Sequence, residues 1–309
     1  YPFILYIIRM HNSFQKTLKT RVSFEGIGLH SGKIARVSLI PANANSGIVF
    51  KRTDIKDNNI IKANYKNISS TNLCTVLKNN NSSCISTVEH LVAAFYITGI
   101  DNILIEVDNA EIPIMDGSSK DFIAIINSAG IKEQSKKRKY VKVIKEIEIN
   151  EGNKHINLTS ESSSLKVDYE LDYENKLISN QRNIINFLSD DLKDIYTSRT
   201  FCLYKDIEKI KKAGLAKGGS LNNAIVVDED RIINKNGLRN EKEFVNHKIL
   251  DLAGDLFLAG YRIIGNIKTK HGGHELNKKC LDLLFSDKNN YEISEMSQPK
   301  IRKENFVIT

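Results

Sequence analysis

Several segments of the chain alternate between hydrophobic and polar residues, or are rich in β-branched residues, as the strands of a sheet are. The stretch 140–149 (YVKVIKEIEI) alternates regularly, and 33–40 (KIARVSLI) is of the β-branched kind. The pattern predicts strands at 33–40, 48–52, 102–107, 140–149, 165–171, 184–188, 224–227 and 261–268.

Other segments have the length and the end signals of helices. Residues 87–98 (TVEHLVAAFYIT) follow Ser86, a good N-cap, and precede Gly99, a good helix stop. The predicted helices are 87–98, 118–129, 205–212, 241–260 and 275–285. Strands followed by helices occur twice along the chain. We therefore expect an α+β fold of two similar domains, with a ligand site between them.

The two patterned halves set the expected domain boundaries. We expect residues 1–16 to be an N-terminal extension, 17–135 to form domain I, 140–285 to form domain II and 286–309 to be a polar tail. The basic run KKRK at 136–139 lies between the two halves and is interpreted as a linker.

The predicted helix at 241–260 carries an unusual polar stripe. From Ile249 to Ala259 it is apolar on nearly every side, as buried helices are. Yet His247, Asp251 and Asp255 follow one another at four-residue intervals and therefore share one face. Buried charges need partners or a metal, and a His and an Asp one turn apart can bind one divalent ion. The alternative is a half-exposed helix whose polar stripe faces water.

Two further segments, STVEH and KHGGHEL, bring histidines from distant parts of the chain. Glu89 fits a capping box with Ser86, and His90 is equally compatible with a core or a surface position. With a metal nearby, this pair would instead be a ligand and an adjacent carboxylate. His271 and His274 flank two glycines, which either form an exposed loop or let the backbone approach a substrate closely.

Composition narrows the class of protein. The 309 residues are 41% hydrophobic and 27% charged, which is typical of globular domains with real cores. The net charge of +8 permits an anionic partner. Because the basic residues are spread out, with no zinc-finger spacing and no aromatic-interleaved basic run, we expect no nucleic-acid binding.

Cysteine usage and the first residues suggest a location. The four cysteines show no CxxC spacing, so reduced thiols in a cytosolic protein are expected. The apolar run at 1–8 is too short to span a membrane and lacks the basic leader of a signal peptide. We therefore expect a cytoplasmic protein without a membrane span.

Seven motifs together carry a resemblance to a known family. They are GIGLHSG at 26–32, ISTVEHL at 85–91, GIDNILIEVDNAEIPIMDGSS at 99–119, SRTF at 198–201, LAKGGSLNNAIVVD at 215–228, EFVNHKILDLAGDL at 243–256 and GHELN at 273–277. With these motifs in this order, the chain resembles the UDP-3-O-acyl-N-acetylglucosamine deacetylases, the zinc amidases of lipid A biosynthesis. The resemblance implies two α+β domains whose helices pack together between the two sheets.

The resemblance also implies a metal centre and an acid–base pair. The positions that match the zinc ligands are His90, His247 and Asp251, which leave a fourth position for water. Glu89 matches the general base, and His274 matches the cationic acid or electrostatic stabiliser.

Other matching positions have supporting roles. Asp255 matches a carboxylate that pairs with the acidic histidine, and Thr200 matches a hydroxyl donor to the developing oxyanion. Lys248 matches a contact to the nucleotide–sugar part of the substrate, although it also fits an ordinary, partly solvated lysine. His30 and Cys74 match residues near the active site, and Cys74 is not one of the ligands.

The family's acyl-chain passage matches a further set of positions. Phe201 and the stretch from Ile207 through Gly219 to Ser220 resemble its wall.

The expected activity is hydrolysis of the 2-acetamido group of UDP-3-O-acyl-N-acetylglucosamine, which gives acetate and a free amine. The expected protein is a monomer with one catalytic Zn²⁺ and a small nucleotide-sugar lipid precursor as substrate. Three alternatives stay open: another acylated amine as substrate, a metal- or lipid-binding protein of this fold without catalysis, and a nucleic-acid-binding protein. Two histidines and one carboxylate also suit Fe(II).

Overall fold

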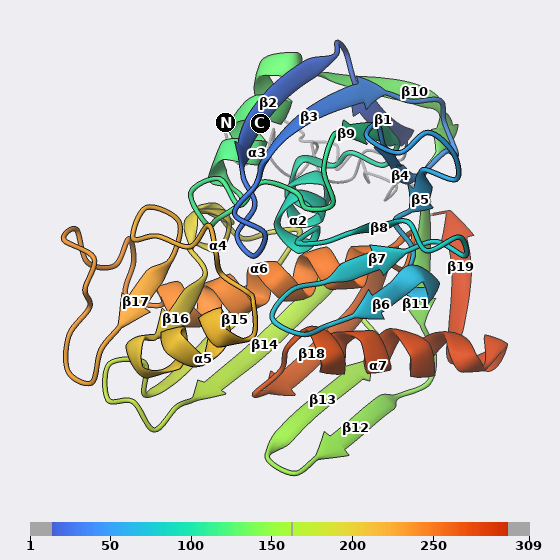
Figure 1. Ribbon diagram of the computed structural model, residues 1–309. Helices are drawn as coiled ribbons and strands as arrows, with labels where there is room; N and C mark the ends of the chain where they lie inside the picture. The colour runs from blue at the N-terminus through green and yellow to red at the C-terminus, as the bar shows by residue number, and fades with distance from the viewer. Residues whose placement is uncertain (1–13, 162, 296–309) are drawn as a thin grey trace, which may run out of the picture.

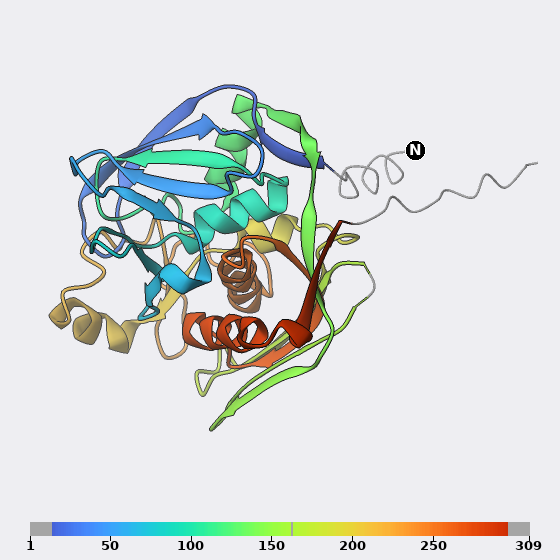
Figure 2. The ribbon, with the colours of Figure 1, turned by 90° about the vertical axis from the view of Figure 1, so that its right-hand side faces the viewer.

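Two large sheets enclose the longest helices in a mixed α/β fold (Figures 1 and 2). The computed structural model describes residues 14–161 and 163–295. In Figure 2 the sheet of the first half lies at the top, the sheet of the second half lies at the bottom, and helices fill the space between them. The predicted α+β fold class is confirmed.

The first sheet has five strands, and the predicted strands within it are confirmed to within one residue at each end. Their spatial order is β2 (Val22–Ile27), β3 (Ile34–Pro41), β9 (Ile103–Val107), β4 (Ile48–Arg52) and β5 (Ile60–Lys62). Only β4 and β9 are parallel. Beside it lies a three-stranded sheet of β6 (Ile68–Ser70), β7 (Val76–Lys78) and β8 (Cys84–Ile85).

The second sheet has seven strands. They are β12 (Ile147–Glu151), β13 (Lys154–Thr159), β18 (Arg262–Lys270), β11 (Lys139–Val143), β19 (Tyr291–Glu295), β14 (Leu165–Asp172) and β15 (Asn180–Asn186). A separate parallel pair joins β16 (Phe201–Leu203) to β17 (Ile225–Val227).

The second sheet departs from the predicted strands in four places. No strand was predicted at β13 (Lys154–Thr159). The single strand predicted at 140–149 is two strands, because the chain leaves the ladder after Val143 and the amides of Ile144 and Lys145 donate to the Asn290 carbonyl. The strand predicted at 184–188 begins and ends earlier, as β15. Strand β19, for which the pattern gave no sign, pairs with β11.

The predicted linker at 136–139 is part of an extended connection. Strand β10 (Ile131–Lys137) pairs with β1 (Phe14–Leu18), and β11 follows after one residue, so the chain runs from the upper half to the lower half as strand (Figure 2). That residue, Arg138, is buried and donates to Asp101 from Nε at 2.8 Å and from Nη2 at 2.7 Å.

The helices follow the predicted segments with shifted ends, except α4 (Lys193–Thr197), where no helix was predicted. They are α2 (Glu89–Thr98), α3 (Lys120–Ala129), α4 (Lys193–Thr197), α5 (Ile207–Lys212), α6 (Glu243–Phe257) and α7 (His274–Ser286), with short 3₁₀ turns at Tyr65–Asn67, Tyr204–Asp206 and Lys288–Asn290. Every residue of α6 except Lys248 is buried, so its polar stripe does not face water. Among the helices of the described ranges, none is long and apolar enough to cross a membrane.

The start of α2 differs from the prediction, and the difference matters for the site. Gly99 ends the helix in the left-handed conformation as predicted, with φ of 82°. Ser86 is not the N-cap, because α2 begins at Glu89 and the Ser86 hydroxyl donates to the Ala110 carbonyl. Glu89 therefore stands at the first helical position instead of the third, and the capping-box interpretation is wrong.

Candidate active site

The site lies where the start of α2 meets the middle of α6. A Cβ atom at Gly254 would lie only 2.2 Å from the carbonyl oxygen of Glu89, so the absence of a side chain lets the two backbones touch. This approach brings Glu89 and His90 of the first half against the polar stripe of α6.

Three predicted metal ligands converge there. The nearest ligand atoms of His90, His247 and Asp251 all lie within 4.8 Å of one another, and all three residues are buried. Asp251 Oδ1 lies 3.3 Å from His90 Nε2 and 3.4 Å from His247 Nε2. Oδ1 is buried and accepts no hydrogen bond from the described residues, which is costly unless a cation is nearby.

The protonation states also suit a metal. The Nδ1 atom of His247 lies 3.1 Å from the Ser198 carbonyl, which can only accept, so Nδ1 carries the proton and Nε2 has a free lone pair. Burial lowers the pKa of His247 to about 3. Burial raises the pKa of Asp251, but His247 and Lys248 outweigh it and hold that pKa well below the usual range. The two His and one carboxylate therefore fit a divalent metal.

Glu89 lies beside these ligands as a separate carboxylate. Its Oε2 accepts from the Thr75 amide at 3.1 Å, and its Oε1 lies 3.8 Å from His274 Nε2. Burial raises the pKa of Glu89, although the charges of His274 and His90 oppose the shift. A buried carboxylate with a raised pKa is a stronger base than an exposed one.

His274 and Asp255 form a buried pair. His274 Nδ1 donates to Asp255 Oδ2 at 2.7 Å, and Asp255 also accepts from the Thr75 hydroxyl at 2.6 Å and from Asn277 Nδ2 at 2.8 Å. Burial alone would lower the pKa of His274, but the charge and hydrogen bond of Asp255, with the charge of Glu89, outweigh it and raise the pKa to about 10. The imidazole is therefore cationic at neutral pH.

Lys248 and Phe201 lie at the edge of the ligand cluster. Lys248 Nζ lies 2.9 Å from Asp251 Oδ2 and 5.6 Å from the centre of the Phe201 ring. That ring lies 6.5 Å from the His247 ring. The backbone of Thr200 is fixed by its amide, which donates to the Gly117 carbonyl, and by its carbonyl, which accepts from Ile225. The role of its hydroxyl stays a prediction.

The remaining predicted substrate-contact residues lie around His30 and in the loop that follows α5. Helix α5 begins at Ile207, and the loop that follows it packs on His30. In this loop the Ala216 amide lies 3.4 Å from His30 Nδ1. Gly219 and Ser220 follow in the same loop. His30 is buried, and burial lowers its pKa, with Glu111 opposing the shift. None of these residues is among the candidate metal ligands, and their contacts to substrate stay predictions.

Three residues of the site escape sequence reasoning. Thr75 and Asn277 hold Asp255, and Ser198 holds His247 through its carbonyl. Asn277 had a signal, because it lies three residues after His274 and so one helical turn away. Thr75 follows Cys74, a buried free thiol whose pKa burial raises to about 12. Ser198 acts through its backbone carbonyl, which every residue type has, so the sequence could not indicate this role.

Comparison with known proteins agrees with this geometry. The profile of the family described as UDP-3-O-acyl N-acetylglycosamine deacetylase matches residues 15–286. A protein of Actinobacillus pleuropneumoniae serotype 3 is 42% identical over 297 residues, which are 95% of this chain and 97% of that protein. Proteins of Glaesserella parasuis serovar 5 and Shewanella frigidimarina are each 43% identical, over 90% and 91% of this chain and 92% of their own lengths. All three relatives are named UDP-3-O-acyl-N-acetylglucosamine deacetylase. The chain belongs to the UDP-3-O-acyl N-acetylglycosamine deacetylase family.

Proposed function

We propose that this protein is a metal-dependent amidohydrolase that removes the 2-N-acetyl group of UDP-3-O-acyl-N-acetylglucosamine in lipid A biosynthesis. Water and the amide give acetate and the free amine. The observation that carries the proposal is the pairing of a buried carboxylate, Glu89, with a cationic histidine, His274, 3.8 Å apart beside three convergent ligand atoms. The names of the relatives supply the substrate.

His90, His247 and Asp251 would hold the metal, which we propose to be a single Zn²⁺. When bound, such an ion supplies Lewis-acid chemistry: it activates water at neutral pH and polarises a carbonyl. The donor set alone also suits Fe(II), so the choice of zinc rests on the family.

The proton transfers are assigned to Glu89 and His274. As water attacks the carbonyl carbon, the Glu89 carboxylate accepts the proton that the water loses. The C–N bond then breaks, and the His274 imidazolium donates a proton to the nitrogen, because an amide anion is a very poor leaving group. Asp255 keeps His274 charged for this step. We propose that the Thr200 hydroxyl donates to the carbonyl oxygen as negative charge develops there.

The substrate would lie across the predicted contact residues. We propose that Lys248 and His30 bind the polar nucleotide-sugar part, and that Phe201, Ile207, Gly219 and Ser220 line the path of the acyl chain. A small anionic substrate also agrees with the net charge of +8. A monomeric, cytoplasmic protein that does not bind nucleic acid is part of the same proposal.

Acetate release from UDP-3-O-acyl-N-acetylglucosamine tests the function. The protein is assayed as purified, after chelation, and after addition of one equivalent of Zn²⁺ or Fe²⁺. Activity that is lost on chelation and restored by metal is the expected result. A folded, metal-loaded protein that releases no acetate from this compound but deacetylates another acylated amine would overturn the substrate. A metal-loaded protein without any amidase activity would overturn the proposal that the protein is an enzyme.

A further inference from the structure

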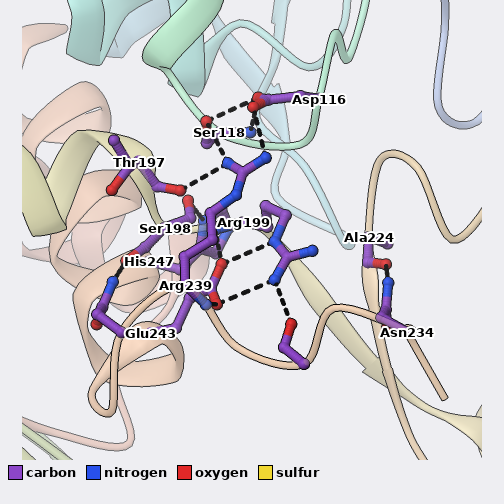
Figure 3. Close-up of polar contacts among 12 residues, drawn as sticks. Asp116, Ser118, Thr197, Ser198, Arg199, Ala224, Asn234, Arg239, Glu243 and His247 are labelled. Carbon is purple, nitrogen blue, oxygen red and sulfur yellow. Dashed lines mark hydrogen bonds and ion pairs between the residues drawn. The ribbon is translucent and has the colours of Figure 1, made fainter. Parts of the chain in front are cut away.

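A buried carboxylate lies next to the metal ligand His247 without belonging to the acid–base pair. Glu243 is the first residue of α6, has 0% exposure and stands one helical turn before His247 (Figure 3). An ionised carboxylate in the interior requires several donors, so its partners show which parts of the chain it holds in place.

Both oxygens of Glu243 are used, and mostly by one residue. Oε1 accepts from the backbone amide of Arg199 at 3.0 Å and from its Nε at 2.8 Å. Oε2 accepts from Arg199 Nη2 at 3.1 Å and from the backbone amide of Arg239 at 2.6 Å. The carboxylate therefore fixes both the side chain and the peptide unit of Arg199.

The peptide unit between Ser198 and Arg199 also holds the ring of His247. Ser198, immediately before it, accepts the hydrogen bond from His247 Nδ1 through its carbonyl oxygen. That carbonyl carbon is bonded to the very nitrogen that donates to Glu243. Thr200 and Phe201 follow directly. The segment is thus tied to α6 at two residues one turn apart, Glu243 and His247.

We propose that Glu243 is a positioning residue of the metal centre. By holding the Arg199 amide it orients the Ser198 carbonyl, which keeps the proton of His247 on Nδ1 and leaves Nε2 directed at Asp251 and His90. This inference rests on the metal centre of the proposed function. It assigns to Glu243 no contact with substrate or metal.

Arg239 extends the same network to the first half of the chain. Its Nη1 donates to the Thr197 carbonyl at 2.8 Å and lies 3.4 Å from the Ser118 hydroxyl. Its Nη2 lies 2.9 Å from Asp116 Oδ2. Figure 3 shows the Arg239 side chain between Glu243 and this turn of the first half.

The turn that Arg239 holds also contacts the third ligand. The Ser119 hydroxyl donates to the carbonyl of His90 at 2.7 Å, and the Gly117 carbonyl accepts from the Thr200 amide at 2.8 Å. One connected set of polar contacts, partly buried and partly exposed, therefore reaches the backbone of His90 and the ring of His247.

A purely stabilising role is the alternative, because breaking a buried ion pair destabilises a protein whatever the pair does. The positioning role predicts, in addition, that loss of Glu243 weakens metal binding. Partners in the outer shell of a metal site typically change metal affinity by about 10- to 100-fold. Metal affinity, measured on folded protein, separates the two roles.

The test is binding of Co²⁺ to metal-free protein, followed by visible absorption in competition with a chelator. Glu243→Gln keeps the size of the side chain but removes its charge and one acceptor. Because Glu243 acts on His247 through the Ser198 carbonyl, we expect the variant's Co²⁺ affinity to fall about 10-fold, the lower end of that range, and its absorption band to change. The control is Asp101→Asn, which breaks the buried pair with Arg138 beyond the opposite end of α2 from His90. It is expected to lower the melting temperature and to keep the wild-type affinity.

A second variant covers the case in which Glu243→Gln does not fold. Arg239 is 30% exposed, and Arg239→Lys loses the fork that joins Thr197 to Asp116. Weakened Co²⁺ binding in this variant supports the inference. Wild-type affinity in every folded variant of the network, or equal weakening in Asp101→Asn, overturns it. A wild-type protein that binds Co²⁺ but releases no acetate would overturn the proposed substrate and leave this inference to be decided by the affinities.

Discussion

At the scale of single residues, Glu89 separates catalysis from metal binding. Glu89→Gln keeps the shape of the side chain and removes the proposed base. Glu89 does not contribute one of the converging ligand atoms, so we expect the variant to retain bound metal. We expect its kcat to fall about 10²- to 10⁴-fold. Steady-state kinetics and metal analysis on the same sample check this. Glu275→Gln, an exposed neighbour of His274, is the control and should keep kcat. A kcat near the wild-type value in Glu89→Gln would remove Glu89 from the mechanism.

Asp255 controls the charge of His274. The folded-state pKa of His274, about 10, lies above its ordinary value of 6.5. The charged form and its stabilising bond are therefore fully present below about pH 6.5 and are lost as the pH rises through about 10. Asp255→Asn removes the charge that raises the pKa, so the basic limb of the pH–rate profile should move to lower pH.

The pH profile needs a matched carboxylate control. Asp282 lies on the same helix as His274 but pairs with Lys278 at the surface. Asp282→Asn should leave the basic limb where it is. If Asp255→Asn also leaves it in place while His274→Ala abolishes activity, the coupling between Asp255 and His274 is refuted. NMR titration of the His274 ring measures the same pKa without an assay.

At the scale of elements, the contact between α2 and α6 depends on Gly254. Alanine is intrinsically the better helix former by about 1 kcal/mol, so an isolated helix would gain from Gly254→Ala. In the protein the new Cβ would lie 2.2 Å from the Glu89 carbonyl oxygen, and overpacking of this kind costs about 1 to 3 kcal/mol. We expect a lower melting temperature together with a reduced kcat, since Glu89 itself must move. A variant as stable and active as the wild type would show that the helices can separate freely.

The elements also show where sequence reasoning succeeds. The four-residue spacing of His247, Asp251 and Asp255 predicts their shared face, because a helix imposes that geometry by itself. The start of α2 was predicted wrongly because a non-local contact decides the conformation there: Ser86 forms an isolated β-bridge with Glu111, and Thr87 adopts φ of 57°. Strand β19 was missed for the same reason, since its five residues form a strand only against β11.

At the scale of the whole molecule, the site draws on both halves of the chain. His90 comes from the first half, and His247 and Asp251 come from the second. The family motifs located these residues, whereas spacing alone could join only the two on α6. That 17–135 and 140–285 are two similar domains stays a prediction. The shared site nevertheless has a consequence for stability, because a metal bound there would join the two halves.

Removal of the proposed metal should therefore destabilise the whole folded protein. A ligand that binds only the folded state stabilises it by about 2.7 kcal/mol at a free concentration 100 times its Kd. Lys248 pairs with Asp251 Oδ2, but the buried Oδ1 accepts no hydrogen bond within residues 14–161 and 163–295, so a cation bound at Oδ1 would stabilise the folded protein. We expect chelation to lower the melting temperature and Zn²⁺ to restore it. His247→Ala, which lacks one proposed ligand, should melt at the same temperature with and without chelator. If neither chelator nor Zn²⁺ changes the melting temperature of the wild-type protein, no metal joins the two halves.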